Sequence, residues 1–314
     1  MKISVDMPMA VNNIPFSPVF ARHETFHPRY GWLKKGYDAI LEDAEVFSRE
    51  DAPTILGVGK NMVKSIRYWG LAFKIFDVAT DSSKRQTAFA TTELGERLLD
   101  NKGWDPYLED PATLWLLHWE LMKQPCKATA WWFAFNEFHH ISFTQDDLFL
   151  ALRSFINRKF LKYSIKDSSL KKDISCILRM YIPRSDSEKQ KEETINSPFA
   201  KLMLFKNYGD SKHFSFNIEK KHNLPAELIV ATCLDHAHAT TENVSTISVS
   251  RLLHEHNSPG LIFKLSEASL CEAVEQVARN FEEISIAESA GLLQFHYNGN
   301  PKEIAYKILD GYYK

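Results

Sequence analysis

Basic side chains recur at helical spacing in one stretch near the start of the chain. Lys60, Lys64 and Arg67 fall on one side of a predicted helix, and Asn61 lies next to them. Lysine and arginine there would neutralise backbone phosphates, and Asn61 or Arg67 could reach the edges of bases. The alternative is an ordinary solvated helix face, which is what most runs of charge are.

Two further basic pairs in the same segment favour nucleic-acid binding over a solvated face. Lys34 and Lys35 lie on an earlier helix, and Lys84 and Arg85 lie at the tip of a predicted hairpin. The chain has 38 Lys and Arg against 40 Asp and Glu, so its formal net charge is -2. This balance excludes a uniformly basic coat, and DNA would therefore have to bind a local patch.

Two small groups of residues could carry acid–base or metal chemistry. His23 and Glu24 follow Arg22, and this combination could move protons or hold a metal; a structural pairing of Arg22 with Glu24 is the alternative. Asp235 and His238 are three residues apart, so they converge only on a helix.

The second group could be completed by histidines that follow it in the sequence. With His254 or His256, Asp235 and His238 could form a metal site of the kind that nucleases use; surface histidines at helix ends are the alternative. The sequence has no HExxH zinc pattern, no GxxxxGK[ST] phosphate loop and no GxSxG elbow. These absences argue against a zinc protease, an ATPase and a serine hydrolase.

Composition is that of an ordinary globular protein. The 314 residues allow two or three domains, with 44% hydrophobic and 25% charged residues. Four scattered cysteines form no CxxC pair, so we expect reduced, mostly buried thiols. The sequence shows no secretory signal and no apolar stretch of membrane-spanning length, and we expect a soluble cytoplasmic protein with no membrane partner.

The elements around the basic helix have the order of a winged helix. Apolar spacing predicts one helix to about Asp43, a second over 48–57 with a Ser48–Asp51 cap, and the basic helix over 60–76. Residues 77–92 predict a β-hairpin, and Thr92 caps a further helix. We predict a winged-helix-like DNA-binding domain over residues 1–103.

The rest of the chain is predicted as two further units, which gives an α+β fold that is mostly α. Residues 104–173 form a helical, aromatic-rich connecting unit, with a capped helix after Thr144. Its aromatic stripe at helical spacing predicts core rather than a cofactor site. Residues 174–314 form an α+β domain with a polar excursion over 184–197, and a second winged-helix variant is one form it could take. Within it, 177–182 and 292–296 are predicted strands, and 285–290 a helix-like step.

Longer motifs along nearly the whole chain resemble one bacterial family. They are HETFHPRYGWLKKGYDAI, REDAPTILGVGKNMVKSIRYW, TELGERLL, DPYLEDPATLWLLHW, CILRMYIP, SPGLIFKLSE and AGLLQFHY. The family that they resemble is the bacterial domain of unknown function numbered four-thousand-and-seven. Similar proteins occur in DNA phosphorothioation loci, beside a cysteine desulfurase, an ATPase and an ATP-pyrophosphatase-like sulfur-transfer protein.

The resemblance implies a DNA-binding B component of the Ssp-type phosphorothioation and anti-phage defence system. DNA nicking has been attributed to that component, and a metal-dependent nickase would use Mg²⁺ or Mn²⁺ with carboxylates or histidines. A non-enzymatic DNA-binding adaptor that recruits the sulfur-transfer partners is the alternative. The resemblance assigns no catalytic residue, so His23, Glu24, Asp235 and His238 are candidates from their chemistry alone.

Overall fold

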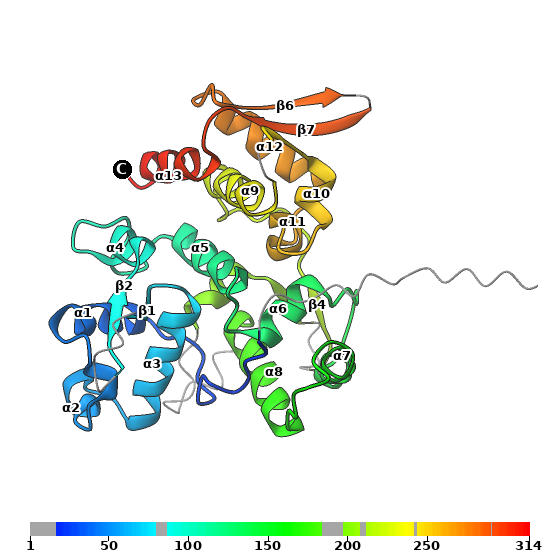
Figure 1. The fold of residues 1–314 in the computed structure, drawn as a ribbon. Helices are drawn as coiled ribbons and strands as arrows, with labels where there is room; N and C mark the ends of the chain where they lie inside the picture. Colours follow the sequence, from blue (N-terminus) through cyan, green and yellow to red (C-terminus); the bar gives the residue numbers. More distant parts are fainter. Residues whose placement is uncertain (1–16, 80–86, 184–196, 208–211, 242–243, 290) are drawn as a thin grey trace, which may run out of the picture.

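The computed structural model describes residues 17–79, 87–183, 197–207, 212–241, 244–289 and 291–314. Helices dominate these residues, and the strands form small antiparallel sheets (Figure 1). The predicted α+β class with mostly α structure is confirmed. Within the described ranges, no helix is both long and apolar enough to span a membrane.

The helices and strands are distributed along the whole described chain. The helices are α1 (Trp32–Glu42), α2 (Ala52–Leu56), α3 (Lys60–Ala72), α4 (Glu93–Leu99), α5 (Pro111–Met122), α6 (Thr129–Asn136), α7 (Gln145–Lys159), α8 (Asp167–Tyr181), α9 (Ala226–Thr240), α10 (Val249–His254), α11 (Pro259–Phe263), α12 (Glu267–Ala278) and α13 (Pro301–Tyr312). The strands are β1 (Phe76–Val78), β2 (Phe89–Thr91), β3 (Phe205–Asn207), β4 (Phe214–Phe216), β5 (Thr246–Ser248), β6 (Ile284–Ser289) and β7 (Leu292–Tyr297).

The first unit, α1 to α4, has the predicted order of helices and strands. Helices α1, α2 and α3 precede the antiparallel pair β1–β2, in which Phe76 lies opposite Thr91. Thr92 begins α4 because its side-chain oxygen accepts a hydrogen bond from the amide of Gly95. This order agrees with the winged-helix prediction, which itself stays a prediction.

Two helix boundaries in this unit differ from the predicted ones. A 3₁₀ turn at Val46–Ser48 precedes α2, and the Ser48 hydroxyl donates to the Thr87 carbonyl (2.8 Å) instead of capping a helix. Helix α3 ends at Ala72, because Lys74 takes a left-handed φ of 57° and the chain turns into β1. Both helix boundaries were predicted wrongly for one reason. The spacing of apolar residues does not show where tertiary contacts end a helix.

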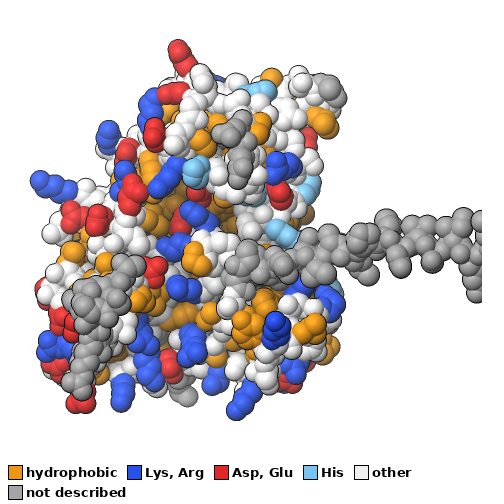
Figure 2. Space-filling model, viewed as in Figure 1, with side chains coloured by type: hydrophobic (Ala, Val, Ile, Leu, Met, Phe, Trp, Pro, Cys, Tyr) orange, Lys and Arg blue, Asp and Glu red, His pale blue; other side chains and the backbone are white. Residues whose placement is uncertain are grey.

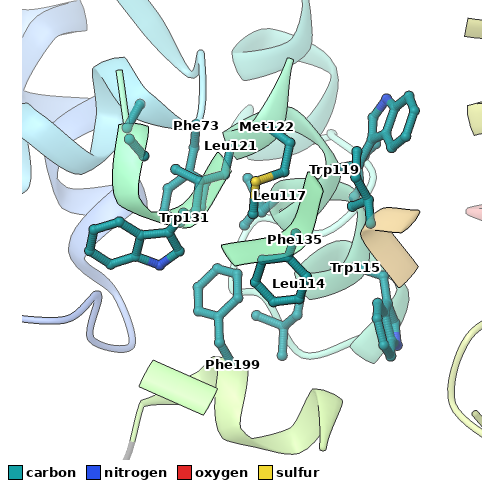
Figure 3. Close-up of a cluster of buried hydrophobic side chains, with 14 of the residues drawn as sticks. Phe73, Leu114, Trp115, Leu117, Trp119, Leu121, Met122, Trp131, Phe135 and Phe199 are labelled. Carbon is teal, nitrogen blue, oxygen red and sulfur yellow. The ribbon is translucent and has the colours of Figure 1, made fainter. Parts of the chain in front are cut away.

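The aromatic stripe of the middle segment forms the core, as predicted. Trp115, Trp131 and Phe135 are fully buried on α5 and α6 (Figure 3). Phe73, just after α3, stacks on Phe199 with 5.2 Å between ring centroids and an interplanar angle of 4°. The hydrophobic core is therefore continuous from the first unit to the segment after α8. The proposed domain boundaries stay predictions.

The last unit, α9 to β7, is built around a three-stranded sheet. Its strand order is β5–β7–β6, and both pairings are antiparallel. Helices α10, α11 and α12 lie between β5 and β6 in the sequence, and α12 contacts α9 and β6. Figure 1 shows the β6–β7 hairpin extending along one edge of the molecule.

Two secondary-structure predictions after residue 174 are wrong. Residues 177–182 are not a strand: the run up to Tyr181 belongs to α8, where Leu170, Ile174 and Ile177 are buried at helical spacing. The helix-like step predicted over 285–290 is not helical in its described part, because Ser285 to Ser289 pair with β7. A run of about six residues can fit either the helical or the strand period, and the element that it packs on or pairs with decides between them.

Helix α13 connects the last unit to the first. It packs on α9, and its Asp310 lies 3.3 Å from Arg97 Nη1 and accepts a hydrogen bond from Trp104 Nε1 (2.9 Å). Trp104 also stacks on Tyr313 with 5.2 Å between ring centroids. The end of the chain thus holds the segment that follows α4.

Candidate nucleic-acid interface

Helix α3 divides its side chains by polarity as the sequence predicted. Lys60, Asn61, Lys64 and Arg67 are exposed, while Ile66 on the opposite side is fully buried. Residues three and four positions apart share one face of a helix, so the exposed cations form one surface. We call these four exposed side chains the α3 face.

Most of the positive charge on the α3 face is free to meet a ligand. Within the described ranges, Lys60 and Arg67 take part in no ion pair. Lys64 Nζ lies 3.4 Å from Glu24 Oε1, and both side chains are partly solvated, so this pair is weak. The predicted catalytic Glu24 therefore lies at the edge of the predicted DNA-binding helix. Figure 2 shows Lys and Arg side chains spread over the lower half of the molecule in that view.

The other predicted DNA contacts are placed differently. Lys34 Nζ lies 2.6 Å from Asp38 Oδ1, and Lys35 Nζ donates to the Leu56 carbonyl (2.8 Å) at the end of α2. Both ammonium groups are thus engaged inside the first unit, where Lys35 satisfies a helix C-terminal carbonyl. Lys84 and Arg85 lie outside the described residues.

The α3 helix leads toward a hollow of ≈ 290 Å³ between the first unit, the end of α5 and α13. Leu71 continues the helical spacing beyond Arg67, and Lys74 follows just after the helix; both line the hollow. Lys123, Lys127 and Lys302 line it as well. Asp77, Glu93 and Glu120 line the same hollow, so its charge is mixed.

A compact ionic cluster lies beside this hollow. Lys123 Nζ lies 2.9 Å from both Glu120 Oε1 and Asp235 Oδ2, and Trp119 Nε1 donates to Asp235 Oδ2 (2.6 Å). Although burial opposes it, the two carboxylates hold the pKa of Lys123 above its usual value. Lys74 donates to the Glu120 backbone carbonyl, and burial lowers its pKa. We call Lys74, Glu120, Lys123 and Asp235 the cleft cluster.

His23 is in the core rather than on a surface. It is fully buried between Trp69 and Trp131, and its Nε2 lies 2.8 Å from Asp173 Oδ1 on α8. Burial lowers the pKa of His23, but the nearby Cys176 and Asp173 more than offset this and raise it to about 10. In this conformation His23 has no exposed surface with which to meet a substrate.

The backbone around His23 is strained. Ala21, Glu24 and Thr25 have φ angles of 55°, 49° and 68°, which non-glycine residues rarely adopt. Contacts with α8 hold this turn: the Ala21 amide donates to Asp173 Oδ1 (2.8 Å), and Arg179 Nη2 donates to the Thr25 carbonyl (2.7 Å). The turn thus fixes Glu24 beside α3.

The candidate residues on α9 do not converge on the predicted histidines. Asp235 contacts α5, and His238 is exposed. His236, which the sequence analysis did not choose, has Nε2 3.4 Å from Glu255 Oε2, and His256 Nε2 lies 3.2 Å from Glu137 Oε1. Within the described ranges, no group of three or more His, Cys, Asp or Glu could hold a metal ion.

The sequence analysis missed most of the cleft cluster. Glu120 and Lys123 lie in or next to α5, a helix that is otherwise apolar and was interpreted only as core. A charged residue within an apolar helix is itself a signal, because buried charges need partners. The partner Asp235 lies more than a hundred residues later, so the pairing could not be found from spacing.

The chain was compared with known families and structures. The sequence model of the family described as "Protein of unknown function (DUF4007)" matches residues 20–313. The chain belongs to the DUF4007 family. The resemblance inferred from the sequence motifs is thereby confirmed.

Two solved structures are similar to this DUF4007 chain over most of its length. One, described as "Magnesium ion-bound SspB crystal structure", is 36% identical with a TM-score of 0.88. The other, described as "SspB crystal structure", is 37% identical with the same TM-score. Each match covers 95% of this chain and 88% of the other. The comparison with curated proteins finds no match.

Proposed function

We propose that this DUF4007 protein is a DNA-binding component of a bacterial DNA phosphorothioation and anti-phage defence system. The observation that carries the proposal is the α3 face, which presents Lys60 and Arg67 without an ion pair among the described residues. Unpaired, exposed cations on one helix face suit a polyanion, because each can neutralise a phosphate and release a counterion. Similarity to the two SspB structures supports the phosphorothioation context.

The proposal extends to nicking of one DNA strand, which would open the backbone for sulfur incorporation by partner proteins. Of the four predicted catalytic residues, Glu24 and Asp235 have carboxylates that are partly exposed and lie beside cations. His23 would act through position, because it anchors the turn that carries Glu24. His238 is exposed but has no recorded contact with Asp235 within the described ranges.

The described residues do not form a ready site for Mg²⁺ or Mn²⁺. The carboxylates of the cleft cluster, Glu120 and Asp235, already share the ammonium group of Lys123, 2.9 Å from each. A divalent cation at the same oxygens would meet that positive charge. One similar structure is described as magnesium-bound, but no catalytic step through a metal follows from the residues of this chain.

A non-enzymatic adaptor is the second candidate function. The neutralisation of Glu120 and Asp235 by Lys123 favours it, because these carboxylates then stabilise the junction of α5 and α9 and need not act on DNA. In this role the protein would hold DNA on the α3 face while the ATPase and sulfur-transfer proteins act on the backbone.

The DNA-binding proposal is tested by removing the charges of the α3 face. The affinity for duplex DNA falls as salt rises, and a plot of the logarithm of the association constant against the logarithm of salt concentration has a negative slope. We expect the variant Lys60→Gln/Lys64→Gln/Arg67→Gln to make this slope less steep by about 3. A matched control is Lys201→Gln/Lys220→Gln/Lys307→Gln, which removes three cations away from α3. Binding that keeps its affinity and salt slope in the first variant would disprove a role for the α3 face.

The nicking proposal is tested with supercoiled plasmid in the presence of Mg²⁺ or Mn²⁺. We expect the wild-type protein to produce open circles, and Glu24→Gln or Asp235→Asn to lower the rate at least tenfold while duplex binding persists. If purified wild-type protein binds plasmid but leaves it supercoiled under all these conditions, the adaptor is the correct function.

A further inference from the structure

A second hollow, of ≈ 630 Å³, lies away from the α3 face and the cleft cluster. Its walls come from the loop after α6, from β4 and the loop that follows, and from α10 and α11. We call it the α11 pocket. The titratable groups that line it are His139, His140, Lys206, Glu219, His254 and Lys264.

Lys264 provides a largely buried cation in the α11 pocket. This residue follows α11 with a left-handed φ of 55°, which turns its side chain back over the middle segment. Its Nζ donates to the Phe135 carbonyl (2.9 Å) and lies 4.3 Å from the centre of the Phe216 ring. Among the described residues no carboxylate forms an ion pair with it, so two of its three N–H donors have no recorded acceptor.

A second lysine lies directly behind the first. Lys221 is buried, and its Nζ donates to the Lys264 carbonyl (2.7 Å). The nearest acid, Glu219, pairs instead with Lys206 at 2.5 Å. Burial lowers the pKa of Lys264 to about 7, with a further decrease from the charge of Lys221, and burial lowers the pKa of Lys221 to about 8.

Two largely buried lysines without an ion pair among the described residues are costly in a protein that binds nothing there. Buried charges are normally paired, because removal from water penalises an isolated ion by several kcal/mol. An anion in the α11 pocket would supply the missing partner. Phosphate suits the site, since a lysine ammonium is a common point-charge contact for phosphate oxygens.

The same pocket has aromatic and apolar walls. The ring of His140 stacks on Phe138, with 4.6 Å between centroids and an interplanar angle of 13°, and His140 is exposed. Ile141 and Ile218 are 91% and 74% exposed at the rim. Phe138 is buried, so the exposed ring is that of His140. An exposed ring and apolar side chains beside a cation are the elements with which proteins hold an unpaired nucleotide.

We propose that the α11 pocket binds a nucleotide, with the phosphate on Lys264 and the base against the His140–Phe138 stack. The nucleotide is either a free mononucleotide or the end of a single strand, since both carry the same base and phosphate. This site is separate from duplex binding by the α3 face. It goes beyond the proposed function and does not depend on it.

The proposal is tested by calorimetric titration of the full chain with thymidine 5′-monophosphate and with 5′-phosphorylated oligothymidine. We expect Lys264→Met and His140→Ala each to weaken binding about tenfold or more. The matched control Lys220→Met removes an exposed lysine that pairs with Glu272, and it should leave binding unchanged. Binding of the mononucleotide as tightly as the oligomer identifies a free nucleotide, and preference for the oligomer identifies a strand end.

Proton uptake gives a second readout that does not depend on the affinity of a variant. At pH 8 the amine of Lys264 is mostly neutral, and a bound phosphodiester would draw a proton onto it. We expect unphosphorylated oligothymidine, whose phosphodiesters do not titrate near pH 8, to be bound with uptake of up to one proton. The uptake should be smaller at pH 5.5 and should decrease in Lys264→Met.

The histidines that line the α11 pocket could also take up protons, so the comparison of Lys264→Met with His140→Ala is necessary. Uptake that persists undiminished in folded Lys264→Met, or a wild-type protein that binds neither ligand, would overturn the proposal. Neither result bears on the α3 face, because the Lys60/Lys64/Arg67 variants keep the α11 pocket and are measured with duplex DNA.

Discussion

The first and last units of the molecule have a similar order of elements but different surface charge: the last unit is acidic, and the first is balanced overall with a local basic face on α3. In the first unit, α2 and α3 precede the β1–β2 pair, and in the last unit, α10 to α12 precede the β6–β7 pair. The exposed side of α3 carries Lys60, Lys64 and Arg67, whereas that of α12 carries glutamates such as Glu267 and Glu275. Residues 226–298 contain 3 Lys and Arg against 10 Asp and Glu.

This difference shows that a partner cannot be assigned from the order of helices and strands alone. A helix that precedes a hairpin can present its outer face to DNA, but only cations on that face attract phosphates. The acidic face of α12 would repel a duplex, so we expect DNA to meet the first unit. The following predictions test this contrast.

The largest loss of stability is expected for a substitution at the buried side of α3. Trp69→Ala should reduce the free energy of unfolding by about 3–5 kcal/mol, because the fully buried indole packs on Phe73 and Trp131. Leu270→Ala on α12 should cost about 2–4 kcal/mol. Urea denaturation measures both, and only Trp69→Ala should also weaken duplex binding. Equal losses of DNA affinity would contradict the separation of the two units.

The contribution of the His23–Asp173 pair to the free energy of unfolding should depend on pH. His23→Gln removes the partner of the buried Asp173 and should cost about 3 kcal/mol at pH 6. The pKa of His23 is raised from 6.5 to about 10 in the folded state, so its contribution is fully present below about pH 6.5 and is lost as pH rises through 10. Urea denaturation at pH 6 and pH 9.5 should therefore show a smaller difference from wild type at the higher pH. A difference that is independent of pH would indicate a neutral His23.

Reversing charge on the α3 face should weaken DNA binding more than neutralising it. We expect Lys60→Glu/Arg67→Glu to lower duplex affinity about a hundredfold at low salt, because two contacts become repulsions. Fluorescence anisotropy with a labelled duplex measures the change, and a circular dichroism spectrum establishes that the variant is folded. A loss below threefold would show that DNA binds elsewhere.

Replacing glutamates of α12 by lysines should change duplex affinity the least. Glu267→Lys/Glu275→Lys should raise non-specific duplex affinity about threefold, because it removes repulsion without building a second DNA site. The same anisotropy titration measures it. A gain as large as the loss caused by Lys60→Glu/Arg67→Glu would mean that both units approach DNA in the same way.

Local signals were sufficient where a single element determines its own structure. The helix after Thr92 and the helix after Thr144 were predicted correctly, because a side-chain cap and an apolar period lie within the same few residues. The exposure of Lys60, Lys64 and Arg67 likewise follows from helical spacing. Strand pairing could not be predicted so well, since the residues of β6 acquire their conformation from β7.

Local sequence patterns did not reveal the contacts of side chains whose partners lie far away in the sequence. Lys35 looked free for DNA, but it donates to the Leu56 carbonyl. Asp235 was chosen as a catalytic candidate without its partners, because Glu120 and Lys123 come from another helix. His23 shows the same difficulty, since its partner Asp173 lies 150 residues later.

The contact between Asp310 on α13 and Arg97 on α4 has a consequence for the charge distribution of the molecule. By tying the last unit to the first, it holds the acidic residues 226–298 in a fixed orientation relative to the cations of the α3 face and prevents the two from rotating freely. Such a body has a permanent dipole moment, and the field of a nearby polyanion exerts a torque on it. The protein would then turn its α3 face toward a duplex before the first contact, and the acidic residues 226–298 would face the solution.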